Sequence, residues 1–191
     1  MKKKIGIVVI GAICIVLAVG AYYYLSHRSA SDDGDVSEVQ KVVLKDLTGS
    51  SYPATPREVI KFYNRILCCY YNETYTEDEF YQLADQALAL MDQELVDNNP
   101  ADQYYLKVKT EVDSYHEKNK TINNASVSDS NEVEFATIDG AECAKLSASY
   151  FMRSDDGTTR SVQNYVLRKD SDGKWKILAF ELAEGADEAD E

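Results

Sequence analysis

The sequence predicts an α+β protein: an N-terminal transmembrane helix, then three helices packed on an antiparallel β-sheet. Residues 5–25 form an uncharged run of 21 residues, which is long enough to cross a bilayer as a helix. Helical spacing with two capping boxes dominates the chain from 55 to about 120. From 122 to 182, apolar and polar residues alternate. Helices followed by antiparallel strands are typical of the α+β class.

The first 28 residues are expected to place a few cytoplasmic lysines before a membrane anchor at 5–25. Lysines at 2–4 precede the apolar run, and three aspartates follow it within 32–35. This asymmetry predicts a cytoplasmic N-terminus, with the C-terminal domain outside the cytoplasm at the cell membrane. Tyrosines at 22–24 lie where aromatic rings favour the membrane–water interface.

Three other interpretations of this segment compete with the anchor. A buried core helix is disfavoured, because nothing polar interrupts the run. A cleaved signal peptide would be cut before Ala21, after the small residues Ala18 and Gly20. The apolar run continues to Leu25, which favours an uncleaved signal-anchor. Lipidation at Cys14 is rejected, because this cysteine lies in the middle of the run behind a bulky isoleucine.

The charge and the breaks in the chain predict its organisation. The net charge is −13, and removing the four basic residues before position 29 leaves sixteen basic residues against 33 acids, or −17. Such a chain is unsuited to nucleic acid, which requires clustered Lys and Arg. We expect a stalk or linker at 29–51, one exported domain at 52–182, and an acidic disordered tail at 183–191. Residues 36–47 fit either a helix or an edge strand.

Capping and turn signals place the elements of the domain. The first helix begins with a capping box at 55–58, the second begins with another at 76–79 and has an apolar stripe reaching Leu95, and the third follows Pro100. Strands are expected at 122–127, 133–138, 142–153, 158–169 and 174–182. Short Asp/Gly turns join the last three strands, which predicts an antiparallel meander.

This order of elements resembles the cone-shaped superfamily of nuclear transport factor 2 and ketosteroid isomerase. The resemblance rests on the first helix, on the long strands of 150–182 and on DGKWKI at 172–177. More narrowly, YPATPREV at 52–59, YYNE at 70–73 and LRKD at 167–170 resemble small membrane-anchored bacterial proteins of unknown function. The superfamily resemblance implies a curved sheet wrapped around a pocket that helices close. Fold alone does not settle function.

The resemblance assigns no catalytic residue to this chain. The candidate pocket lining is aromatic: Tyr63, Tyr70, Tyr150 and Tyr165. Aromatic residues at such spacing are more often plain core than the lining of a ligand site.

Cysteine and metal chemistry receive little support. The candidate redox thiols are Cys68, Cys69 and Cys143, and ordinary thiols are favoured over a bridge between Cys69 and Cys143. His116 is the one exported histidine, and it suits the C-terminal end of a helix better than a cysteine–histidine pair. No cofactor and no metal ligands are expected.

The leading hypothesis is a single-pass membrane protein whose extracytoplasmic domain binds another protein or a small ligand without catalysing a reaction. A pocket isomerase or hydrolase of the cone superfamily is the first alternative. A homodimeric envelope module is the second, and it is suggested by the expected position of Tyr165 and Leu167 on an open face of the sheet, away from Val162 and Val166.

Overall fold

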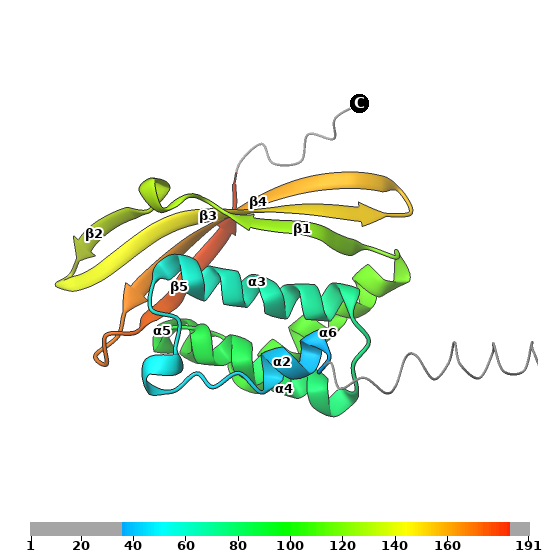
Figure 1. Cartoon of the computed structure of the whole chain (residues 1–191), viewed down its shortest axis with the longest axis horizontal. Coiled ribbons are helices and arrows are strands. Elements are labelled where there is room, and N and C mark those ends of the chain that lie inside the picture. The colour runs from blue at the N-terminus through cyan, green and yellow to red at the C-terminus, as the bar shows by residue number, and fades with distance from the viewer. Residues whose placement is uncertain (1–35, 184–191) are drawn as a thin grey trace, which may run out of the picture. The chain divides into compact units, whose positions relative to one another are not determined.

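The structure, a computed structural model, describes residues 36–183 and is an α+β domain (Figure 1). The helices are α2 (Glu38–Val43), α3 (Pro56–Asn72), α4 (Glu77–Leu90), α5 (Gln93–Asn98) and α6 (Ala101–Glu117). The strands are β1 (Thr121–Val127), β2 (Glu134–Ile138), β3 (Ala141–Ser154), β4 (Gly157–Lys169) and β5 (Trp175–Leu182). The helices pack against the antiparallel sheet, as the sequence predicted.

The sheet has the order β1-β3-β4-β5, so the last three strands form the predicted meander. The two remaining strands share one edge of β3. Strand β2 pairs with its first part, from Ala141 to Lys145, and β1 pairs with its second part, from Ala148 to Arg153. Figure 1 shows the long β3–β4 hairpin sweeping across the helices.

Helices α3 and α4 begin where their capping boxes predicted. The Thr55 side chain accepts a hydrogen bond from the Glu58 N–H, and the Glu58 carboxylate accepts one from the Thr55 N–H. Thr76 and Glu79 repeat the arrangement at the start of α4. Each box satisfies N–H groups that have no partner inside the helix.

The open question at 36–47 is resolved as a helix. Ser37 caps α2, and Val39 and Val42 are fully buried in the core. The Arg65 guanidinium lies 2.7 Å from the Glu38 carboxylate and ties α2 to α3. The folded domain therefore begins before the boundary expected at residue 52.

The second predicted helix is two helices. Helix α4 ends at Leu90, and Met91 forms a parallel bridge with Ile177 of β5. The Asp92 N–H then donates to the Ile177 carbonyl at 2.8 Å, and the Asp92 side chain caps α5. The prediction of one helix reaching Leu95 was wrong, because the backbone at Met91 and Asp92 pairs with the sheet edge.

The core lies between the helices and one face of the sheet. Tyr165 and Leu167 of β4 are both 0% exposed and belong to this core, together with Ile177 of β5. The expectation that Tyr165 and Leu167 lie on an open face was wrong. The face of β4 that contacts the helices carries them, so they offer no surface to a second copy of the chain.

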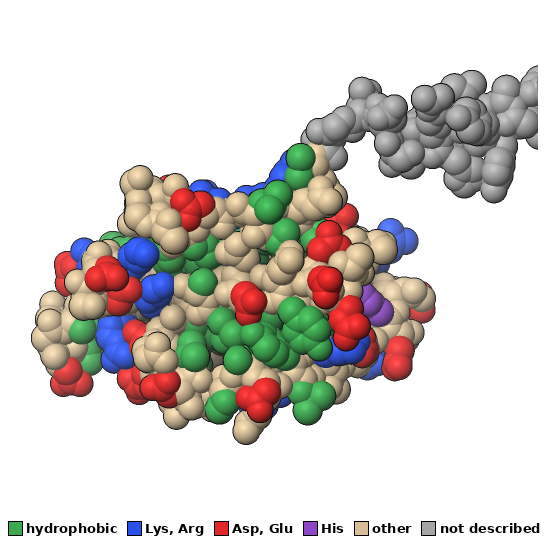
Figure 2. Space-filling view, turned by 90° about the horizontal axis from the view of Figure 1, so that it is seen from below, with side chains coloured by type: hydrophobic (Ala, Val, Ile, Leu, Met, Phe, Trp, Pro, Cys, Tyr) green, Lys and Arg blue, Asp and Glu red, His purple; other side chains and the backbone are tan. Residues whose placement is uncertain are grey.

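The helical surface is mixed in character. Figure 2 shows apolar side chains gathered near the middle of this face, with acidic side chains among and around them. Exposed apolar residues on the helices include Tyr81 of α4 and Leu106 of α6.

Several expectations concern residues outside the described range: the anchor at 5–25, the first part of the linker and the tail from 184 onward. Between residues 36 and 183, no helix is both long and apolar enough to span a bilayer.

Candidate functional site

A cavity of about 280 Å³ lies between the sheet and helices α3, α5 and α6. We call it the tyrosine pocket, because its lining includes Tyr63, Tyr70, Tyr71, Tyr104, Tyr115 and Tyr150. The apolar part of the wall is completed by residues such as Leu67, Met91 and Leu95. The exposed side chains of Glu111 and Phe180 also line the pocket, so it runs from an exposed rim to a buried end.

Three of the four tyrosines predicted to line a pocket do so: Tyr63, Tyr70 and Tyr150. Tyr165 is not part of the lining. It lies behind it, with its ring edge-on to the Tyr63 ring at 6.1 Å between centroids. The alternation of β4 predicted the buried face that carries Tyr165, but not how far the cavity reaches.

A chain of hydrogen bonds supports the buried end of the pocket. The Tyr150 hydroxyl lies 2.6 Å from both the Asn64 Oδ1 and the Tyr165 hydroxyl. The Tyr165 hydroxyl also lies 2.6 Å from the Gln163 Oε1 at the pocket wall. These hydrogen bonds link α3 to the centre of the sheet and fix the orientation of the Tyr150 ring.

The polar groups of the pocket centre on Glu111 of α6. Its carboxylate accepts a hydrogen bond from the Tyr71 hydroxyl at 2.9 Å. Burial, and then the charge of Glu111, raise the pKa of Tyr71 far above its usual range. Tyr71 also stacks on Tyr115, with ring centroids 4.6 Å apart. Tyr71 is therefore held by its ring and by its hydroxyl.

Two other hydroxyls of the lining are not engaged. Within residues 36–183, neither the Tyr63 nor the Tyr104 hydroxyl forms a hydrogen bond, although Tyr63 is buried and Tyr104 half-buried. A tyrosine hydroxyl is protonated at neutral pH, and burial raises the pKa of both groups further. The pocket therefore contains two hydroxyl donors with no protein acceptor.

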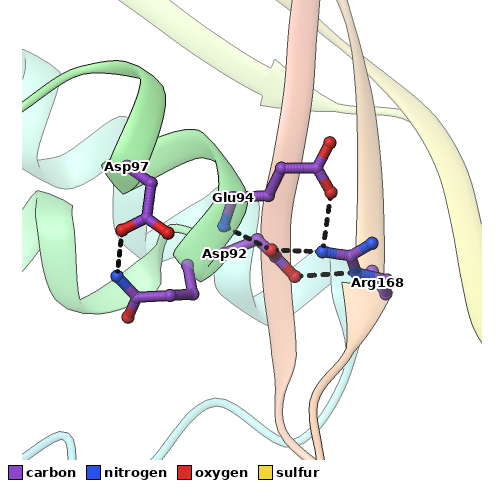
Figure 3. A network of polar contacts seen from close by, with 5 residues as sticks. Asp92, Glu94, Asp97 and Arg168 are labelled. Carbon is purple, nitrogen blue, oxygen red and sulfur yellow. Dashed lines mark hydrogen bonds and ion pairs between the residues drawn. The ribbon is translucent and has the colours of Figure 1, made fainter.

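One wall of the pocket is positioned by an ion-pair network between α5 and β4 (Figure 3). The Arg168 Nε lies 3.0 Å from the Asp92 Oδ2, and a guanidinium nitrogen contacts the other Asp92 oxygen and, at 3.1 Å, Glu94. Burial raises the pKa of Asp92, but the hydrogen bonds from Arg168 and from the Glu94 N–H outweigh it and lower the pKa overall. The network holds α5, whose Leu95 lines the pocket.

The predicted redox thiols do not come together. Cys68, Cys69 and Cys143 are all free, so no bridge joins Cys69 to Cys143. Burial raises the pKa of Cys68, and it raises that of Cys69 to about 12. A raised thiol pKa opposes nucleophilic chemistry.

Histidine and metal ligands also fail to form a centre. The His116 Nε2 lies 2.9 Å from the Tyr70 carbonyl and donates to it. No group of three or more His, Cys, Asp or Glu side chains in the described part of the chain is arranged to hold a metal ion.

Sequence reasoning missed Tyr71, Tyr104 and Glu111 as pocket residues. The sequence contains a signal for two of them. Tyr104 and Glu111 are seven residues apart on α6 and therefore share one face of the helix. An aromatic stripe on a helix predicts a buried face, but it does not show whether that face lines a cavity.

Comparisons with known proteins extend the description. A variant of the helical cell shape determining protein Pgp2 from Campylobacter jejuni is similar in structure, with a TM-score of 0.36 and 16% sequence identity. The match covers 66% of this chain and 41% of that protein, so the chain spans less than half of its length. At this score the similarity supports no inference about fold or function. No curated protein matches the chain.

A family profile matches residues 1–180, which is nearly the whole chain. Its description is a domain of unknown function, DUF6715. This agrees with the expectation of a family whose role is uncharacterised. The chain belongs to the DUF6715 family.

Proposed function

We propose that this protein is a single-pass membrane protein whose extracytoplasmic domain binds a small molecule in the tyrosine pocket without transforming it. The observation that carries the proposal is the pair of unpartnered hydroxyls, Tyr63 and Tyr104, in a cavity walled by aromatic rings. Ligand pockets are typically apolar cavities with a few polar groups that fix orientation. The pocket has this composition.

The ligand chemistry follows from the lining. A cavity of about 280 Å³ accepts a small, compact molecule. Its ring or apolar body would pack on the tyrosine rings, and an oxygen would accept hydrogen bonds from Tyr63 and Tyr104. The carboxylate in the lining, Glu111, already accepts from Tyr71, and this supports a binding role over acid–base catalysis.

The membrane part of the proposal rests on the sequence, and its fold part rests on the arrangement of the helices and strands. The uncharged run at 5–25 supports an anchor, and the lysines before it support an extracytoplasmic domain. A pocket enclosed between helices and an antiparallel meander supports a cone-like fold. Alkali extraction of membranes and protease treatment of intact cells test the topology. Release of the protein into the soluble fraction by alkali, or a C-terminal domain that the protease does not cleave, would contradict the proposed topology.

Binding is tested with the full chain in nanodiscs and 4-fluorophenol as the probe, followed by fluorine NMR. We expect saturable line broadening that Ser161→Phe abolishes, since Ser161 lines the pocket. Val162→Phe is the matched control, because its side chain lies on the opposite face of β4. Non-saturable broadening, or equal broadening with both variants, would contradict the proposal.

A further inference from the structure

A second hollow, of about 530 Å³, lies between α3 and the edge strand β1. We call it the α3–β1 groove. It is lined by Arg57, Lys61, Asn64, Arg65 and Cys68 of α3 and by residues 124–127 of β1. We propose that this groove binds an extended, acidic peptide segment of a partner protein, which adds to the sheet beside β1. The proposal does not depend on the tyrosine pocket.

Helix α3 is fastened to β1 at both ends of the groove. At one end, the Asn72 side chain donates to the Ile122 carbonyl and accepts from the Ile122 N–H, both at 2.8 Å. At the other end, the Arg57 Nε donates to the Ser128 carbonyl at 2.6 Å. The Asn72 amide thus pairs with β1 as a neighbouring strand would. The groove lies between these two contacts.

The backbone of β1 offers hydrogen bonds to this space. Among residues 36–183, β1 pairs with β3 and with no other strand, so its other side is an open edge of the sheet. The Ser128 N–H donates across the ladder to Ser147. Because orientation alternates along an antiparallel strand, the N–H and C=O groups of Val127 and Ala125 are directed to the open edge. An added strand would pair with these four groups.

A buried amide in the groove also lacks a partner. Asn64 is 5% exposed, and its Oδ1 accepts from Tyr150, but its Nδ2 has no hydrogen-bond partner in residues 36–183. A buried donor without an acceptor destabilises the folded state, because the group has lost its water without gaining a partner. Native proteins rarely leave such a group unsatisfied unless a ligand or water completes the site. A carbonyl or carboxylate of an inserted segment would supply the acceptor.

The charges of the groove select an acidic segment. Three basic side chains of α3 line it, and two of them are paired: Arg65 with Glu38 at 2.7 Å, and Arg57 with Asp129, beside the groove, at 3.6 Å. Lys61 has no partner within the described residues. The chain has a net charge of −13, whereas the lining of the groove carries more basic than acidic side chains. The groove would attract acidic side chains and repel basic ones.

The test uses the full chain in nonionic detergent and a fluorescein-labelled peptide of alternating valine and glutamate. The peptide has about five residues, enough to pair along 123–127, the part of β1 that lies between the two contacts with α3. We expect saturable binding by fluorescence anisotropy that weakens as salt is added. The lysine counterpart should bind at least about tenfold more weakly. Failure of the acidic peptide to bind, or equal binding of the lysine peptide, would overturn the proposal.

Two variants locate the site. Lys61→Glu should weaken binding about tenfold, whereas Lys109→Glu, the same charge change on α6, should not. Ala125→Pro removes one outward N–H and should weaken binding by a similar factor, because proline is tolerated on an edge strand. A wild-type chain tested with a peptide N-methylated at alternate residues probes the same ladder without altering the protein. Undiminished binding of that peptide, or equal effects of the two lysine variants, would refute strand addition in this groove.

Discussion

Replacing Asp92 separates two roles that the structure gives one side chain. Its carboxylate pairs with Arg168, and it also accepts from the Glu94 N–H as the cap of α5. Asp92→Asn keeps a good capping residue and removes the charge, whereas Asp92→Ala removes both. The difference between the two variants therefore measures the cap, and the asparagine variant measures the ion pair.

The expected magnitude follows from burial. The Asp92 side chain is 6% exposed and that of Arg168 is 31% exposed. Breaking a fully buried pair costs about 3–5 kcal/mol, but Arg168 keeps water and Glu94 as partners, so we expect about 2 kcal/mol for Asp92→Asn. Asp92→Ala should cost about 1 kcal/mol more. For a chain of this size, the first loss lowers Tm by about 4–8 °C.

The assay is thermal unfolding of the full chain, followed by the fluorescence of Trp175. This is the single tryptophan of the sequence, and it is buried at the start of β5, so the signal reports on the folded domain. Unfolding should be measured for the wild type and both variants at neutral pH and again in acid.

The pH dependence has a definite sign. The pKa of Asp92 is lowered in the folded state, so the unfolded state takes up the proton first as the pH falls. The stabilisation by the carboxylate is complete above the unfolded value of about 3.9 and is lost below it. The advantage of the wild type over Asp92→Asn should therefore shrink between about pH 5 and pH 3. An advantage that stays constant over this range, or that is absent at pH 7, would refute the reasoning.

Three further predictions concern the core, a cap and the thiols. Tyr150→Phe should lower the free energy of unfolding by about 1–3 kcal/mol, because it leaves the Asn64 Oδ1 without a donor; urea unfolding measures it, and an unchanged midpoint would contradict it. Thr76→Ala removes the α4 cap and should cost about 1 kcal/mol, with Thr76→Ser as the conservative control. Iodoacetamide should modify half-buried Cys68 before Cys69, which is fully buried; peptide mass mapping gives the order, and the reverse order would contradict the assigned burial.

The sequence predicted the elements whose signals are local. The capping boxes of α3 and α4 and the Asp/Gly turns between the last three strands depend on neighbouring residues, and each element begins or ends within one or two residues of its expected place. The break at Met91 could not be predicted this way, because its cause is pairing with Ile177. The apolar spacing of 80–95 continues smoothly through the break.

The difference between local signals and contacts of distant segments also explains why the sequence predicted the buried tyrosines but not the cavity. Helical and strand periodicity placed Tyr63, Tyr70 and Tyr150 on buried faces, but periodicity does not tell a packed core from a cavity. That difference depends on how tightly α6 packs on the sheet. Asn64 shows the limit most clearly. Its position on the helix predicted a place on the far side from Val59, beside charged residues, yet it is buried, and its Oδ1 accepts a hydrogen bond from Tyr150 of β3.

Helix α3 contributes residues to both candidate sites, because one of its faces is apolar and the opposite face is polar. Its apolar face carries Tyr63 and Tyr70 into the tyrosine pocket, and its polar face carries Arg57, Lys61 and Asn72 along β1. Plain packing would be served by an apolar residue at position 64, because this position is buried. Asn64 instead buries an amide whose Oδ1 is hydrogen-bonded and whose Nδ2 is not, and this destabilises the folded state. This destabilisation is offset if both neighbours use the residue: Tyr150 on the pocket side, and a ligand acceptor on the groove side.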